Sequence, residues 1–299
     1  ARVLTSNAAP RRSFNGQMIG HRSFLITKAE RERFVRDNPE CDEVIYPYLN
    51  GREFLSGAGV PDRFVIDLGE RDLLEASRYP KVLKHIENHI LPDRYRKAHE
   101  TKTTDGAMRS HHKGFLERWW QLSFSRPELI RLIEQSNRYL ACSLVTKRAV
   151  FVFVSSKVRP SNLLQVFTFD DDFTFGILQS NAHWQWFAAK SSKLKTDYRF
   201  GEGVWNTFPF PQSPTPAQVD AVANAGRAVR RVRDEYLPKM KGGLRALYRT
   251  LDKPGKSPLR DAHAALDAAV LNAYGFTAKK PILKQLLDLN LEVASRIDR

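Results

Sequence analysis

The sequence predicts an α+β protein, in which a region with a mixed sheet is followed by an α-helical bundle or hairpin module. Residues 138–186 read as several short strands that lead into an aromatic-rich helix. From residue 216 onward, apolar residues recur at helical spacing, and a Pro- and Ser-rich segment, 212–216, separates the two patterns. We therefore expect three parts: a flexible basic lead-in over residues 1–13, a folded region over 14–212 and a helical module over 213–299.

Local signals place several elements of the first region. Thr27 and Glu30 form a capping box, which predicts a short helix from Lys28 to Arg36. Residues 63–69 read as a strand. Further helices are expected over residues 72–90, with an interruption near Pro80, and over 126–135 and 179–190.

Residues 92–114 are rich in Arg, Lys and His and contain almost nothing apolar. This composition predicts a mobile basic loop. Two interpretations remain open for it: a solvated surface loop, or a loop that closes on phosphates and becomes ordered when it does so.

The helical module is predicted to contain four helices. The first covers residues 216–237 and carries Arg227, Arg230, Arg231 and Arg233 on its polar side. Gly242 and Gly243 break the pattern before a helix that ends near Leu251. Two amphipathic helices are expected over 259–274 and 281–297.

The charge of the chain indicates a polyanionic partner. Its 299 residues include 48 Lys and Arg against 33 Asp and Glu, so that the formal net charge is +15. Neither Cys41 nor Cys142 has a second Cys or a His at the spacing of metal ligands. No apolar run approaches the length of about 18 residues that a membrane-spanning helix needs. We expect a cytoplasmic protein with no membrane contact. Because the chain begins with Ala1 in a polar basic stretch, we also expect it to be a piece of a longer protein.

No catalytic constellation is recognisable in the sequence. A Gly-rich S-adenosylmethionine loop after a strand is missing, and so is the Asn/Asp-Pro-Pro-Tyr/Phe motif that holds a flipped base. Asp67, Glu100 and Lys102 have the spacing of a metal-dependent nuclease site, but Glu100 and Lys102 lie in a polar stretch, where chance explains the spacing better. The run Asp170–Asp172 favours a hairpin turn over a cation site. We expect no metal site.

Seven segments in this order resemble one known family: VIYPYLNGREF (44–54), RFVIDLG (63–69), ERWWQ (117–121), FGILQSNAHWQW (175–186), WNTFPFP (205–211), LDAAVLNAYGF (266–276) and LLDLNLE (286–292). Together they are similar to the C-terminal half of large bacterial adenine-specific DNA methyltransferases. These include MmeI-like single-chain restriction–modification enzymes and related phage-defence methyltransferases.

The resemblance implies a DNA target recognition domain over residues 14–212 and a helical module over 213–299 that packs on the methyltransferase domain. It implies double-stranded DNA and the catalytic domain of the same polypeptide as partners. The methyl donor, S-adenosylmethionine, would bind that catalytic domain, so that no cofactor is expected in this chain and the chain alone is not expected to be catalytic.

The expected site residues fall into two classes. Residues 143–148 match by position the region that carries specificity in the family, so Ser143, Thr146, Lys147 and Arg148 are expected to read bases. Contacts to phosphates are expected from Arg94, Arg96, Lys97, Lys113, Ser180, Asn181, His183, Lys193, Lys195 and Arg199.

Two other functions remain as alternatives to DNA recognition. One is a metal-dependent nuclease that uses Asp67, Glu100 and Lys102. The other is a non-catalytic protein-interaction module whose positive charge serves an acidic protein partner.

Overall fold

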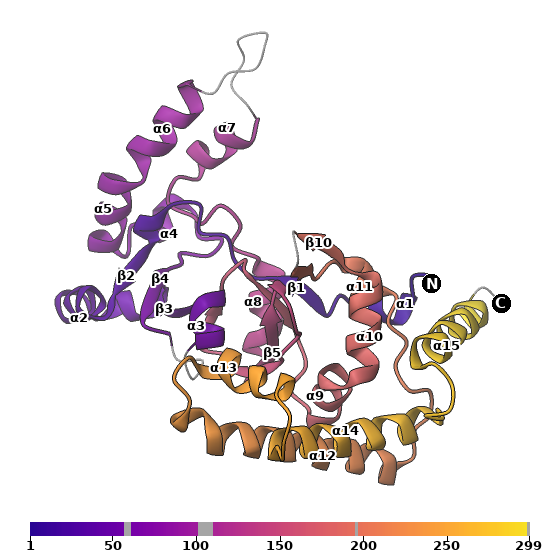
Figure 1. Cartoon of the computed structure of the whole chain (residues 1–299). Helices are drawn as coiled ribbons and strands as arrows, with labels where there is room; N and C mark the ends of the chain where they lie inside the picture. Colours follow the sequence, from indigo (N-terminus) through magenta and orange to yellow (C-terminus); the bar gives the residue numbers. More distant parts are fainter. Residues whose placement is uncertain (57–60, 101–109, 195–196, 298–299) are drawn as a thin grey trace.

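A computed structural model of the chain describes residues 1–56, 61–100, 110–194 and 197–297. A central antiparallel sheet lies in the middle of the molecule, a second sheet with a protruding helical arm lies on one side, and long helices cover the base (Figure 1). The α+β class predicted from the sequence is confirmed. None of the helices in these ranges is long and apolar enough to cross a membrane.

The central sheet has the strand order β1-β9-β5-β7, with all neighbours antiparallel. Its strands are β1 (Ser13–Asn15), β9 (Leu164–Phe167), β5 (Arg138–Ser143) and β7 (Val152–Ser155). Side chains alternate between its two faces, as a strand requires. Tyr139 and Ala141 of β5 pack with residues of α3 (Gly51–Ser56) and α8 (Pro127–Glu134), whereas Leu140 and Cys142 face α9 (Asp172–Gln179) and α10 (Asn181–Lys190).

The second sheet is mixed and has the order β2-β4-β3-β8, in which only the β3–β8 pair is parallel. Its strands are β2 (Leu25–Thr27), β4 (Arg63–Ile66), β3 (Ile45–Leu49) and β8 (Arg159–Pro160), and the helices beside it are η1 (Arg22–Phe24), α2 (Lys28–Asp37), η2 (Pro39–Val44) and α4 (Leu73–Ala76). The predicted capping box begins α2: the Glu30 amide donates to Thr27 Oγ1 at 3.2 Å, and the Thr27 amide donates to Glu30 Oε2 at 2.7 Å.

The arm consists of α5 (Pro80–His89), α6 (Leu91–Glu100) and α7 (Ser110–Glu117), and it extends away from the two sheets (Figure 1). The prediction of a loop over residues 92–114 was therefore wrong for its described part, which is mostly helical. The arm is held by a polar contact that periodicity does not reveal. The buried Arg94 side chain donates hydrogen bonds to the carbonyl oxygens of Phe115, Arg118 and Gln121 at 2.8–2.9 Å.

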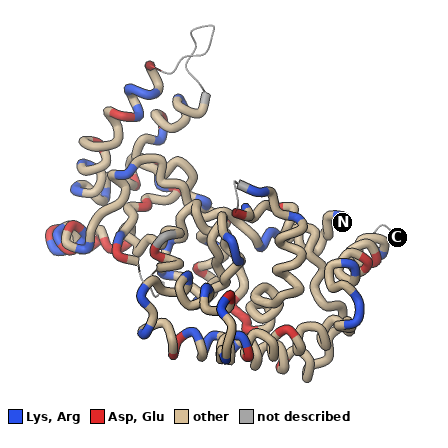
Figure 2. Tube along the Cα trace, viewed as in Figure 1, with Lys and Arg blue, Asp and Glu red and all other residues tan. Residues whose placement is uncertain are grey.

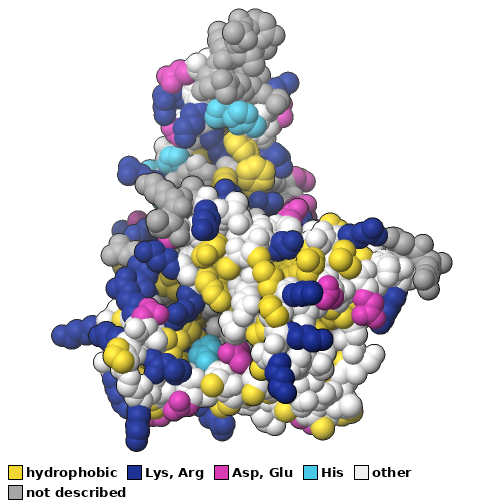
Figure 3. Space-filling view, turned by 45° about the vertical axis from the view of Figure 1, so that its right-hand side comes forward, with side chains coloured by type: hydrophobic (Ala, Val, Ile, Leu, Met, Phe, Trp, Pro, Cys, Tyr) yellow, Lys and Arg dark blue, Asp and Glu magenta, His cyan; other side chains and the backbone are white. Residues whose placement is uncertain are grey.

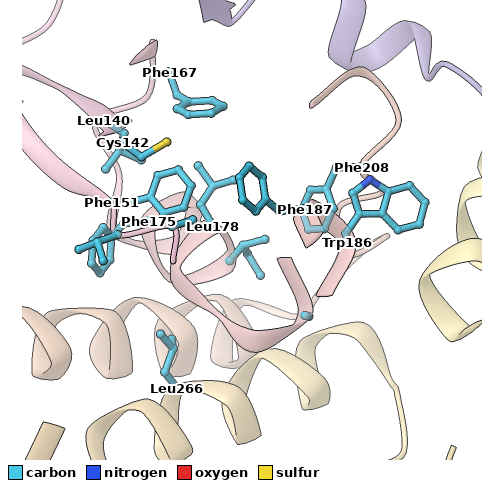
Figure 4. Packing of buried hydrophobic residues seen from close by; sticks show 14 of the residues in the cluster. Leu140, Cys142, Phe151, Phe167, Phe175, Leu178, Trp186, Phe187, Phe208 and Leu266 are labelled. Atoms are coloured by element: carbon cyan, nitrogen blue, oxygen red, sulfur yellow. The ribbon is translucent and has the colours of Figure 1, made fainter. Parts of the chain in front are cut away.

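The helical module confirms the predicted helices within two or three residues at each end. It follows α11 (Glu202–Asn206) and contains α12 (Pro216–Tyr236), η3 (Leu237–Lys239), α13 (Gly243–Arg249), η4 (Thr250–Asp252), α14 (Pro258–Tyr274) and α15 (Ile282–Ile297). Its apolar face closes the largest core of the molecule. Leu266 of α14 extends toward Phe175 and Leu178 of α9, which pack in turn below Phe167 of the central sheet (Figure 4). The segment 212–216 thus does not separate two cores.

Two further expectations from the sequence do not match the structure. Residues 170–172 do not form a hairpin turn: Asp171 caps α9, and Asp172 forms ion pairs with Arg138, Arg227 and Arg230. The lead-in over residues 1–13 is also anchored. It contains α1 (Thr5–Ala8), and Leu4, which is 1% exposed, packs on Val293 and Ala294 of α15.

Candidate nucleic-acid interface

A small third sheet brings two groups of predicted site residues together. Its order is β10-β11-β6, with β10 (Ser192–Leu194), β11 (Asp197–Arg199) and β6 (Val145–Thr146). Arg199 lies opposite Val145, and Tyr198 lies opposite Thr146. The strand end expected to read bases is therefore a direct neighbour of a hairpin that carries Lys193 and Arg199, two of the residues expected to contact phosphate.

A cleft of about 690 Å³ opens beside this strand end. One wall carries Thr146, Lys147 and Arg148, and the opposite wall is α13 with its following turn. The charged residues that line it are four cations (Lys147, Arg148, Arg245, Arg249) and two acids (Asp197, Asp252). We call this space, between residues 145–150 and 245–252, the basic cleft.

Arg148 connects the two walls of the basic cleft. Its Nη1 donates to the carbonyl oxygen of Tyr248 at 3.0 Å, and its Nη2 contacts Asp252 Oδ1 at 3.0 Å. The half-buried guanidinium therefore fixes the strand end against the helical module. In this arrangement both terminal nitrogens of the Arg148 guanidinium already bind the helical module.

The other three residues expected to read bases differ in their access to solvent. Thr146 is buried and closes the turn, because its Oγ1 donates to the carbonyl oxygen of Arg148 at 2.6 Å and accepts from the Arg148 amide at 3.2 Å. Ser143 is buried within β5, so that its hydroxyl cannot reach a base. Lys147 is exposed, and none of the hydrogen bonds or ion pairs of the described residues occupies its side chain.

A buried cation lies beneath the basic cleft. Arg233 is 3% exposed, and its guanidinium donates to Tyr248 Oη, to the Phe151 carbonyl oxygen at 2.7 Å and to Gln179 Oε1 at 2.6 Å. Arg233 was expected on a polar helix face, but α12 turns it inward. Among the described residues its partners are all uncharged, so its charge adds to the positive potential of the cleft. Burial, with Arg233 and Arg148 nearby, lowers the pKa of His263 to about 3, which leaves that imidazole neutral.

The phosphate contacts expected from the arm need one correction. Arg94 is buried, desolvation lowers the pKa of its guanidinium to about 10, and its donors bind backbone carbonyls, so it is a structural residue. Of the other three expected residues, Arg96 and Lys113 are exposed and Lys97 is half-buried. Each has a carboxylate neighbour: Arg96 binds Asp93 and Glu100, Lys97 binds Asp93 at 2.7 Å, and Lys113 lies 3.9 Å from Glu117.

The predicted phosphate anchor at the start of α10 is also covered. Ser180 is 1% exposed and caps the helix, and His183 is fully buried among aromatic rings, where desolvation lowers its pKa to about 3. The Asn181 amide donates to the Asp267 carboxylate of α14 at 2.7 Å. A carboxylate of the helical module thus occupies the helix start that a phosphate was expected to reach.

Lys193 and Arg199 are exposed on the β10–β11 hairpin, and Lys195 lies outside the described residues. Lys and Arg positions occur along both the arm and the lower helices, interspersed with Asp and Glu (Figure 2). On the face shown in Figure 3, Lys and Arg side chains gather toward the lower left, around a hollow with apolar side chains at its floor.

The geometry does not support a nuclease site. Asp67 is buried at the end of β4, where its carboxylate accepts from Gln17 Nε2 at 2.7 Å and from the Gly69 amide at 3.0 Å, and desolvation raises its pKa. Glu100 ends α6 and pairs with Arg96, while Lys102 lies outside the described residues. In the described ranges, no three His, Cys, Asp or Glu residues form a group able to hold a metal ion.

Sequence reasoning missed Arg245 and Arg249, which supply the helical wall of the basic cleft. Their spacing of four residues on α13 places them on one helix face, which was a readable signal. What the sequence did not show is that this face lies opposite residues 146–148, about a hundred positions earlier in the chain.

Comparisons with known proteins agree with one another. The family described as MmeI, target recognition domain, matches residues 5–212. A curated protein named DNA methyltransferase A, from Bacillus subtilis (strain 168), is 34% identical over 140 residues, which are 46% of this chain and 15% of that protein.

A solved structure of the Type IIL restriction-modification enzyme MmeI in complex with DNA has a similar fold, with a TM-score of 0.73 and 23% sequence identity. The match covers 95% of this chain and 35% of that one. The present chain therefore spans between about one seventh and about one third of the length of these relatives. Because the family match covers more than half of its residues, the chain belongs to the MmeI target recognition domain family.

Proposed function

We propose that this chain selects the DNA sequence on which a methyltransferase acts. In this proposal the chain binds double-stranded DNA, and the catalytic domain of the same polypeptide transfers a methyl group from S-adenosylmethionine to adenine N6. The observation that carries the proposal is membership in a target recognition family, together with a small sheet that borders a basic cleft. No residue of this chain is assigned to S-adenosylmethionine, since the sequence has no Gly-rich loop after a strand.

The geometry supports a division of labour between neighbouring side chains. Lys147 is exposed directly after β6, where a side chain can donate to the N7 and O6 atoms of guanine in the major groove. Lys193 and Arg199 on the adjoining hairpin are suited to the phosphate backbone, which supplies most of the affinity and little of the specificity. Arg148 and Thr146 hold the strand end in place.

The experiment uses the full-length protein that contains this chain, expressed in cells whose DNA is then sequenced for methylated adenines. We expect Lys147→Ala to relax the methylated motif at one position, because a good base contact contributes about 1–3 kcal/mol of discrimination, or roughly 5- to 150-fold. We expect Lys193→Ala to lower methylation at all sites alike and to leave the motif unchanged.

Lys157→Ala is the matched control, since Lys157 is exposed at the far end of β7 from the basic cleft. If the methylated motif stays the same in Lys147→Ala, the strand end does not read a base. The same conclusion follows if Lys193→Ala and Lys157→Ala relax the motif as much as Lys147→Ala does. A full-length protein that leaves DNA unmethylated would overturn the methyltransferase part of the proposal.

A further inference from the structure

We propose that Arg245 and Arg249 form a phosphate-binding wall, so that the helical module holds the DNA together with the target recognition domain. This inference rests on the proposed function and extends it to residues outside the family match, which ends at residue 212. In this inference the sugar-phosphate backbone of one DNA strand lies in the basic cleft, and its bases face residues 146–148.

The two arginines are free to bind an anion. Both are exposed, and within the described residues neither side chain takes part in a hydrogen bond or an ion pair. The acid that lines the cleft on their own wall is Asp252, which is engaged by Arg148 at 3.0 Å. Like Lys147, Lys193 and Arg199, the two arginines form no ion pair with a carboxylate of the described residues, so they place unneutralised positive charge at the edge of the cleft.

The spacing of the pair fits a polyanion with regularly repeated charges. Side chains four residues apart on a helix have Cβ atoms about 5–6 Å apart. Each DNA strand carries one negative charge per about 3.4 Å along the helix axis, so two such arginines can contact neighbouring phosphates of one strand. An arginine guanidinium also binds a phosphate through two parallel N–H groups, which fixes orientation as well as charge.

The wall is held rigidly against the rest of the molecule. Gly243, at the start of α13, approaches the backbone of α3 so closely that a Cβ atom there would lie 2.5 Å from the Ser56 carbonyl oxygen. Leu244, Leu247 and Tyr248 of α13 are buried. The arginines are therefore presented at a fixed distance from the strand end, as a site that sets the register of DNA requires.

The buried Arg233 strengthens the same field. It contacts the Tyr248 hydroxyl group, while the Tyr248 carbonyl oxygen accepts from Arg148. One turn of α13 is thus surrounded by Arg233 and by three arginines that line the cleft, at positions 148, 245 and 249. The cleft is lined by two acids. Such an excess of positive charge favours an anionic ligand along the cleft.

The test measures DNA binding by the full-length protein as a function of salt, with a duplex that contains its methylation motif and an unrelated duplex. The variant Arg245→Ala/Arg249→Ala is compared with Lys279→Ala/Lys284→Ala, which removes the same charge from exposed positions at and before the start of α15. We expect the arginine variant to lose roughly 10- to 100-fold in affinity for both duplexes, and the slope of log K against log salt to become shallower by about 2.

The lysine control should bind nearly as tightly as the unchanged protein, and Arg245→Lys/Arg249→Lys should recover most of the lost affinity, because the charge is retained. All variants should show the unfolding temperature of the unchanged protein, since the altered side chains are exposed. If the protein binds DNA but the arginine variant keeps its affinity and its slope of log K against log salt, the phosphate-binding wall is overturned and the proposed function stands. A full-length protein without salt-dependent DNA binding overturns the proposed function and the wall with it.

Discussion

His183 illustrates how burial changes the role of a residue that looked suited to phosphate. Its ring lies 4.9 Å from that of Phe208 and 5.4 Å from that of Phe151, and its pKa is lowered to about 3 because desolvation disfavours the imidazolium ion. The side chain therefore behaves as a neutral part of the core. The half-buried His263, whose Nε2 lies 2.9 Å from the Tyr248 hydroxyl oxygen, also has its pKa lowered to about 3.

These two histidines predict a loss of stability in mild acid. Above pH 6.5 they are neutral in the folded and the unfolded chain, so they add no pH dependence. Below pH 6.5 the unfolded chain takes up protons that the folded chain refuses until its lower pKa is reached. The free energy of unfolding should therefore fall by about 1.4 kcal/mol per pH unit for each histidine as the pH decreases.

Urea unfolding at pH 7.5 and 5.5 checks this expectation. His183→Leu should reduce the stability lost between the two pH values by about 1.4 kcal/mol, because one of the two groups is gone. His89→Leu, at an exposed position of α5, controls for the removal of an imidazole. An unaltered pH dependence in His183→Leu would mean that His183 accepts its proton in the folded state as readily as in the unfolded state.

At the scale of elements, the sequence predicted what depends on neighbours along the chain. The capping box at Thr27 and Glu30 predicted the start of α2, and helical periodicity predicted α12, because each signal lies within the helix concerned. Residues 92–114 were misread because α6 is fixed by Arg94, a polar side chain that binds carbonyls 21–27 positions away. Asp171 was misread because Asp favours turns and helix starts alike.

At the candidate site, too, local features could be predicted from the sequence and tertiary contacts could not. The exposed cations of residues 147–199 could be named from the sequence, but which of them are occupied could not. Arg148 is engaged by Tyr248 and Asp252, about a hundred positions away, and the Asn181 amide at the start of α10 donates to Asp267. Such partners are set by tertiary packing, on which local patterns carry no information.

The contact between α9 and α12 gives a prediction at the element scale. A Cβ atom on Gly176 would lie 2.6 Å from Val222 Cγ1 and 3.0 Å from the Val222 carbonyl oxygen. Gly176→Ala should therefore lower the free energy of unfolding, since overpacking costs about 1–3 kcal/mol. The higher helix propensity of Ala, about 1 kcal/mol, offsets only part of this cost.

Chemical denaturation of the variant and of Gly114→Ala measures the effect of the contact. Gly114 lies in α7 with no atom within 4 Å of a Cβ placed there, so the same substitution should be neutral or stabilising. If both variants change stability in the same direction, helix propensity and not the helix contact decides the outcome.

For the whole molecule, the central fact is that one core crosses the predicted boundary at residues 212–216. Phe167 and Phe175 come from the target recognition region, and Val229 and Leu266 come from α12 and α14, yet all four are fully buried in one cluster. The family match ends at residue 212, where the core does not end. The helical module is therefore a structural part of the recognition domain as well as one wall of the basic cleft.

This arrangement predicts that residues 1–212 do not form a stable monomer when they are produced alone. Removal of α12–α15 exposes the apolar face of α9 and α10 and leaves the Asp172 carboxylate without Arg227 and Arg230. We expect the fragment to bind a hydrophobic dye, to lack near-ultraviolet circular dichroism and to unfold without a cooperative transition. Co-production of residues 213–299 as a separate chain should restore all three properties, because it supplies the missing face of the core. A fragment 1–212 that unfolds cooperatively by itself would show that the recognition region folds independently and that the shared core is an interface between two autonomous domains.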